Sequence, residues 1–158
     1  MSSTIGQVSI APMSQDEAEA IARWSYEPPY DFYEAPADED DLAELLDAAV
    51  RTDRYFAAHD GAAQLVGFFE FKREDNVVVV GLGLRPDLTG LGLGLTFVED
   101  GLDFARAQFH PLRFRLSVAE FNERAIKVYE RCGFTRTRSF LHDTNGGTFP
   151  FVEMERRA

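Results

Sequence analysis

The chain has 158 residues and a formal net charge of −11 at pH 7. This length suits one domain with one core, which we expect to span residues 1–158. Because an acidic surface repels phosphate backbones, we expect no nucleic-acid partner. Hydrophobic residues make up 45% of the chain, but no apolar run approaches the roughly 18 residues of a membrane helix, so we expect no membrane partner.

The N-terminal segment and the reactive side chains narrow the class of protein further. Residues 1–17 lack a basic stretch followed by an apolar one, so we expect no signal peptide and a cytoplasmic protein. Cys132 is the only cysteine, which excludes an intrachain disulfide. The three histidines lack metal-ligand spacing, and we expect no metal site.

The first half of the chain is expected to form a strand, two helices and a meander. A short strand over residues 8–11 precedes Ser14 and Glu17, which form the pattern of a capping box for a helix toward Trp24. Leucines at helical spacing predict a second helix over residues 42–50. Turn-like segments then separate three strands, at residues 55–58, 64–72 and 77–84.

The second half is expected to alternate helices and strands and to end in a hairpin. The predicted elements are a helix over 91–108, a strand over 113–118, a helix over 122–131 and paired strands over 135–142 and 148–154. This order predicts an α+β protein.

A glycine-rich loop follows the buried strand at residues 77–84. Gly90, Gly92 and Gly94 alternate along it and lead into a helix. Glycines at this spacing let backbone N–H groups approach an anion, and with the helix N-terminus they form a phosphate cradle. A tight turn that permits close helix packing would explain the same glycines, so the motif alone leaves both interpretations open.

A dinucleotide-binding domain is the specific competitor for this loop. Its glycines should follow the strand directly in a Gly-x-Gly-x-x-Gly pattern, whereas Pro86 and further residues intervene here. The chain also lacks a series of βαβ units. This alternative is therefore the weaker one.

A second motif, in residues 118–134, reads Asn-x-x-Ala-x-x-x-Tyr-Glu-x-x-Gly-Phe from Asn122 onward. It resembles motif B of the GNAT acyltransferases, and the segment from Leu82 to Gly94 resembles their motif A. Order and spacing agree over residues 65–135. The resemblance implies a three-layer fold, in which helices flank a mixed, mostly antiparallel sheet whose central strands, 77–84 and 113–118, splay apart.

The resemblance also implies the roles of particular residues toward acetyl-CoA, the expected cosubstrate. Its pantetheine arm would pair with main-chain groups at Leu82 and Leu84 and with the Asn122 side chain, and Tyr129 would lie beside the thioester sulfur. The pyrophosphate would be held by the loop residues Thr89, Gly90, Leu91, Gly92, Leu93 and Gly94.

Thr89 departs from the family pattern, which usually places Arg or Gln there. The loss of a charge-assisted contact predicts weaker cofactor binding, by about 1.5–3 kcal/mol. We expect Thr89 still to cap the helix and to bond a phosphate oxygen.

Acetyl transfer to an amine needs a proton donor for the thiolate and a base for the ammonium. We expect Tyr129 to be the general acid in a direct attack. Glu70 is the first candidate for the base, because a strand face shared with Val66 and Phe68 would bury its carboxylate and raise its pKa. Glu120 is the second candidate.

An aromatic and acidic segment, residues 24–34, is expected to form the wall of the acceptor site. Its Tyr26, Tyr30, Asp31 and Tyr33 suit a small cationic amine, through π faces and a carboxylate. Packing of these rings on the core is the alternative. Two further points stay open: a homodimer, and an acyl-CoA-binding sensor or non-catalytic module in place of an enzyme.

Overall fold

A seven-stranded mixed sheet forms the centre of the protein, and in this computed structural model residues 7–158 are described. The first six residues of the expected domain lie outside that part. The strand order is β1-β2-β3-β4-β5-β7-β6. The strands are β1 (Ser9–Pro12), β2 (Tyr55–His59), β3 (Leu65–Glu74), β4 (Val77–Leu84), β5 (Arg113–Ala119), β6 (Thr135–Thr144) and β7 (Gly147–Arg157).

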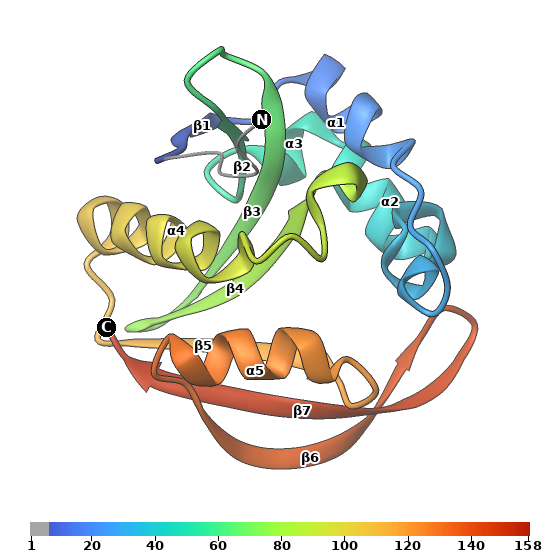
Figure 1. Cartoon of the computed structure of the whole chain (residues 1–158), viewed down its shortest axis with the longest axis vertical. Coiled ribbons are helices and arrows are strands. Elements are labelled where there is room, and N and C mark those ends of the chain that lie inside the picture. Colours follow the sequence, from blue (N-terminus) through green and yellow to red (C-terminus); the bar gives the residue numbers. More distant parts are fainter. Residues whose placement is uncertain (1–6) are drawn as a thin grey trace.

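Helices cover both faces of the sheet, which confirms the expected three-layer α+β architecture (Figure 1). One face is covered by α4 and α5, and the half of the other face over β2 and β3 is covered by the N-terminal helices. The helices are α1 (Gln15–Ala22), α2 (Glu39–Leu46), α3 (Ala48–Arg51), α4 (Gly94–Phe109) and α5 (Glu123–Arg131).

Local sequence signals placed most of these elements correctly. The Ser14 side chain accepts from the Glu17 N–H, and the Glu17 carboxylate accepts from the Ser14 N–H, so the predicted capping box is present. The C-terminal hairpin turns at Asn145 and Gly146, both with positive φ, as a two-residue hairpin loop requires.

Two helix boundaries were predicted wrongly. The single helix expected over residues 42–50 is two helices, because Asp47 has an extended ψ of 112° and caps α3 through the Ala49 N–H. The helix expected from residue 91 begins at Gly94. Gly90 and Gly92 have φ of +74° and +78°, and this left-handed conformation cannot continue a right-handed helix.

Phenylalanine rings hold α4 against the sheet. Phe69 on β3 stacks on Phe97 of α4, with ring centroids 4.5 Å apart. A Cβ at Gly101 would lie 2.2 Å from the Phe69 ring, so only glycine allows α4 to approach β3 this closely.

The two middle strands stay paired only at one end. The parallel register of β4 and β5 joins Val77–Val79 to Arg113–Arg115 and stops there. Beyond it, β4 continues to pair with β3, and β5 continues to pair with β7. The predicted splay of these strands is therefore present.

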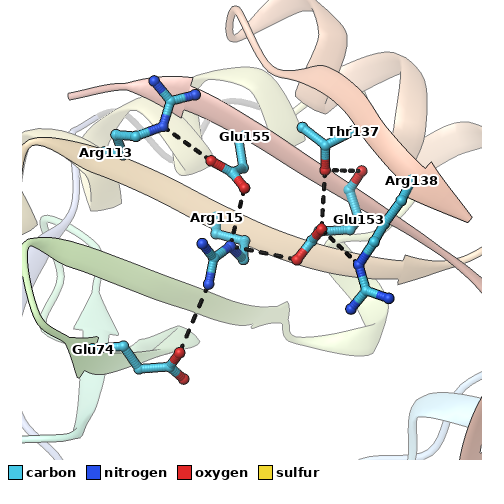
Figure 2. A network of polar contacts seen from close by, with 7 residues as sticks. All are labelled: Glu74, Arg113, Arg115, Thr137, Arg138, Glu153 and Glu155. Carbon is cyan, nitrogen blue, oxygen red and sulfur yellow. Dashed lines mark hydrogen bonds and ion pairs between the residues drawn. The ribbon is translucent and has the colours of Figure 1, made fainter. Parts of the chain in front are cut away.

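An ion-pair network crosses the sheet at the joined end (Figure 2). Arg115 on β5 contacts Glu155 and Glu153 on β7 and reaches Glu74 on β3. Arg113 also pairs with Glu155. These contacts link β5 to β7 and, across β4, to β3, just before β4 and β5 diverge.

We expect Glu155→Gln to destabilise the protein at pH 7 by about 0.5–1 kcal/mol, the worth of an exposed or half-buried ion pair. Hydrogen bonds from Arg113, followed by Arg115, lower the pKa of Glu155. A lowered folded-state pKa gives stability that is present above the unfolded pKa of about 4.3 and is lost as pH falls through the folded value. Urea unfolding of both proteins between pH 3 and 7 should show the difference shrinking toward acid; a constant difference would contradict this assignment.

Candidate active site

A cavity of about 370 Å³ opens where β4 and β5 part. The second half of β4 forms one wall, and Leu116, Ser117 and Val118 of β5 form the other. Segments 26–33, 88–94 and the face of α5 complete the lining. The sequence-predicted cofactor and acceptor residues thus meet at one place, although they are up to about a hundred positions apart; the exceptions are Leu91 and Asp31, which are exposed and do not line the cavity.

The backbone of β4 presents unpaired groups to this cavity. The Arg85 N–H donates to Val66 O on β3. Because backbone groups alternate sides along a strand, the N–H and C=O groups of Leu82 and Leu84 point away from β3, toward the cavity. The Leu84 C=O accepts from the Tyr26 hydroxyl at 2.8 Å, which leaves its N–H free for a ligand.

The loop between β4 and α4 forms one end of the cavity. Its positive-φ glycines turn the chain so that α4 begins at Gly94. Within residues 7–158, none of the N–H groups of residues 90–93 donates to a backbone acceptor. With the free amides of the first turn of α4, they form a surface suited to an anion.

Thr89 lines the cavity but does not cap α4, contrary to the expectation. The residue before the helix is Leu93, which makes no side-chain cap. The Thr89 hydroxyl donates its proton to Pro86 O at 2.8 Å. Toward a ligand, its oxygen can therefore act only as a hydrogen-bond acceptor.

Asn122 and Tyr129 lie on the opposite wall, positioned by α5. Asn122 is buried, and its Oδ1 caps the helix by accepting from the Ala125 N–H at 3.1 Å. Its Nδ2 donates to the Tyr33 hydroxyl at 3.2 Å. Tyr129 lies further along the helix, and burial raises the pKa of its phenol, so the hydroxyl stays protonated and can donate a hydrogen bond.

The segment 24–34 covers the cavity through Tyr26, Tyr30 and Tyr33. Asp31 is exposed and does not line it. Phe32 turns the other way, with its ring edge-on to Phe121 and Phe149. The three tyrosines thus line the cavity, while Phe32 packs on the protein; that they contact an acceptor stays a prediction.

The tip of the β6–β7 hairpin anchors this segment. Asn145 Nδ2 donates to Phe32 O, and Asp38 accepts from both the Thr144 hydroxyl and the Asn145 N–H. The C-terminal hairpin lies beside residues 30–38 in Figure 1.

The two carboxylates considered as bases lie elsewhere. Glu70 does not line the cavity, and its carboxylate pairs with Arg54. It shares its strand face with Phe68 but not with Val66, because the β2–β3 register shifts at residues 58/59 and turns Val66 toward the α4 side. Glu120 is exposed at the end of β5 and is also absent from the lining.

Sequence reasoning missed Ser117 and Arg124, both of which line the cavity. Ser117 could have been inferred from the splay, since it belongs to the half of β5 that pairs with β7 but not with β4. Arg124 had a detectable signal, because Arg124, Lys127 and Arg131 recur at the three- and four-residue spacing of one helix face.

Splayed central strands, a glycine loop at a helix N-terminus and a cavity between them define an acyltransferase-type architecture. Residues 17–134 match the family described as "Acetyltransferase (GNAT) family". The chain belongs to this family. A crystal structure of spermidine N-acetyltransferase from Vibrio cholerae in complex with CoA and spermine has the same fold, with TM-score 0.77, 20% identity, and coverage of 96% of this chain and 95% of that one.

Relatives by sequence include two kinds of acetyltransferase. Mycothiol acetyltransferase from Actinosynnema mirum is 37% identical over 90 residues, which are 55% of this chain and 30% of that protein. Spermidine N(1)-acetyltransferase from Vibrio cholerae is 25% identical over 122 residues, or 72% of this chain and 65% of that one. The chain thus spans under a third of the first relative's length.

Two further observations concern metal ligands and membrane helices. Among residues 7–158, no group of three His, Cys, Asp or Glu side chains is placed to hold a metal ion. None of the helices in the same range is long and apolar enough to cross a bilayer.

We expect Asn122→Ala to destabilise the fold by about 1 kcal/mol through loss of the helix cap. Asn122→Asp retains the cap acceptor but loses the Nδ2 donor to Tyr33, so its stability should stay near that of the wild type. Urea unfolding of both variants separates the two contacts. Equal losses in Ala and Asp would show that the bond to Tyr33, and not the cap, stabilises this corner.

Proposed function

We propose that the protein transfers the acetyl group of acetyl-CoA to a primary amine by direct attack. The observation that carries this proposal is the cavity between β4 and β5, where free main-chain groups, a glycine loop and the half-buried phenol of Tyr129 meet. When bound, acetyl-CoA would supply the activated acyl group and the leaving thiol. Leu82, Leu84, Asn122 and residues 89–94 would hold its arm and diphosphate.

The chemical step leaves the protein two tasks. The amine nitrogen attacks the thioester carbon, the C–S bond breaks with its electron pair going to sulfur, and the nitrogen loses one proton while the sulfur gains one. Tyr129 would donate its hydroxyl proton, as a hydrogen bond or completely, to the developing thiolate. The Leu84 N–H would polarise the thioester carbonyl, and the Tyr26 hydroxyl holds the next peptide by donating to the Leu84 C=O.

Deprotonation of the incoming ammonium is the costly part. For an alkyl amine with pKa near 10.4, it costs roughly 4–5 kcal/mol at neutral pH. The described residues that line the cavity include no carboxylate and no histidine. We therefore assign proton removal to water in the cavity mouth. Glu70 pairs with Arg54 through Oε2, and its Oε1 lies 3.3 Å from the position that a Cβ on Gly81 would occupy, so it stays the second candidate for this step.

A cationic amine is the acceptor class that the surroundings favour. The chain carries −11 charge overall, and Tyr26, Tyr30 and Tyr33 line the cavity, where aromatic rings can attract a cation. Two of the similar proteins are named as acetyltransferases of spermidine, a cation of this kind.

The second candidate is a module that binds acyl-CoA without turning it over. The absence of a carboxylate or imidazole from the described lining favours it. The two functions share the cofactor site and differ only in chemistry.

Binding and turnover together decide between these functions. CoA at 100 times its Kd should stabilise the fold by about 2.7 kcal/mol, measured by thermal shift. Free thiol should then appear with acetyl-CoA and a diamine or polyamine, faster than with an uncharged primary amine of equal length. Stabilisation without thiol release from any amine supports the binding module, and no stabilisation contradicts both.

Tyr129→Phe should lower kcat by roughly 10²-fold, the usual contribution of a positioned proton donor, and leave the affinity for CoA nearly unchanged. Because burial raises the pKa of this phenol, the wild type should lose no activity to its ionisation up to about pH 10, the ordinary tyrosine value. Tyr55→Phe is the matched control, since Tyr55 is buried outside the cavity. Unchanged turnover in Tyr129→Phe would remove this residue from the mechanism.

A further inference from the structure

The loop that would hold the diphosphate contains no charged side chain. Its residues 89–94 are threonine, glycine and leucine only. Neutral amides can bind a diphosphate, but hydrogen bonds to charged groups are stronger when the donor is also a cation. A cation from another element would complete such a site.

Arg124 reaches this loop from the first turn of α5. Its Nη1 lies 3.5 Å from the position that a Cβ on Gly90 would occupy. The same side chain lines the cavity beside the loop. The guanidinium therefore lies close enough to the loop at Gly90 for one anion to contact both the loop amides and the arginine.

The guanidinium is oriented by a ring and not by a carboxylate. It lies over the Tyr30 ring, with 4.1 Å from Cζ to the centroid. Within residues 7–158 it forms no ion pair, unlike Arg54, Arg85 and Arg115. All its donors are thus free for an anion, and a stacked arginine keeps its planar fork in a fixed orientation.

The charged side chains around Arg124 are mostly basic, although the protein as a whole is acidic. Lys127 and Arg131 follow it on the same helix face and line an adjoining hollow with it, together with one acid, Glu123. In a chain of −11 charge, these three cations in the adjoining hollow raise the local concentration of an anionic ligand.

We infer that Arg124 supplies the charged contact to the diphosphate of coenzyme A that the loop itself lacks. This inference rests on the proposed function, because it deepens the cofactor site. Arg124 acts here as a binding residue, with Tyr30 positioning its guanidinium between the acceptor wall and the cofactor.

The test compares the affinities of Arg124→Gln and wild type for CoA and for dephospho-CoA by calorimetry. Loss of one charge-assisted contact should raise Kd by about 10- to 100-fold. A diphosphate contact predicts the same loss for both ligands, since both contain the diphosphate. Arg136→Gln, an exposed arginine on β6, carries the same charge change and should bind as wild type does.

Three outcomes would overturn the inference. One is a Kd for Arg124→Gln within about 3-fold of wild type, because that difference corresponds to less than half of the smallest binding free energy expected for the contact. Another is a loss that appears with CoA but vanishes with dephospho-CoA, because the arginine would then bind the 3′-phosphate. The third is an equal loss in Arg136→Gln, which would indicate net charge alone. Failure of wild type to bind either ligand would instead contradict the proposed function.

A cation restored within the loop gives an independent check. Thr89→Arg in the Arg124→Gln background should recover most of the lost affinity, because Thr89 borders the same cavity. The unliganded melting temperature of Arg124→Gln should match that of wild type. A lowered melting temperature with no recovery by Thr89→Arg would show that Arg124 only fastens residues 24–34 to α5.

Discussion

The separation of β4 from β5 after three paired residues is the constraint on which the site depends. A strand inside a sheet normally has partners on both edges, and a buried backbone group without a partner is costly. Here β4 pairs with β3 over its whole length but has one free edge beyond Val79. Those free groups are the most specific feature of the cavity, since they can bind an extended, amide-containing chain as a further strand would.

The rest of the fold keeps the strands apart at one end and together at the other. At the joined end, Arg115 connects β5 to β7 and β3 through carboxylates (Figure 2). At the open end, α4 is held on β3 by stacked phenylalanines and the close approach at Gly101, while α5 packs through Val128 against Gly94. The two sheet halves therefore each carry a helix, and the cavity lies at the seam.

The aromatic segment relates the two sides of the site to each other. Tyr26 bonds the β4 backbone, Tyr33 bonds Asn122 on α5, and Tyr30 contacts Arg124. The hairpin tip fixes the segment at Phe32 and Asp38. The β4 backbone, Asn122 and Arg124 thus all contact this one segment, so its movement would alter all three.

Local signals along the chain predicted the strands, most helices and their order, the glycine loop and the motif on α5, because capping boxes, turn glycines and hydrophobic periodicity act over a few residues. The two motifs also indicated the family and the splayed strands. The predicted helix boundaries were wrong at Asp47, where the backbone is extended, and before Gly94, where two glycines have positive φ.

Only the tertiary structure decided which side chains share the cavity. Glu70 was expected to be a partly buried carboxylate on a face shared with Val66 and Phe68, but its carboxylate pairs with Arg54 and it does not line the cavity. Arg124 showed only a helical spacing of charge, whereas its position beside Gly90 depends on how α5 crosses the glycine loop. Such placements arise from contacts between residues far apart in the chain, and no local pattern records them.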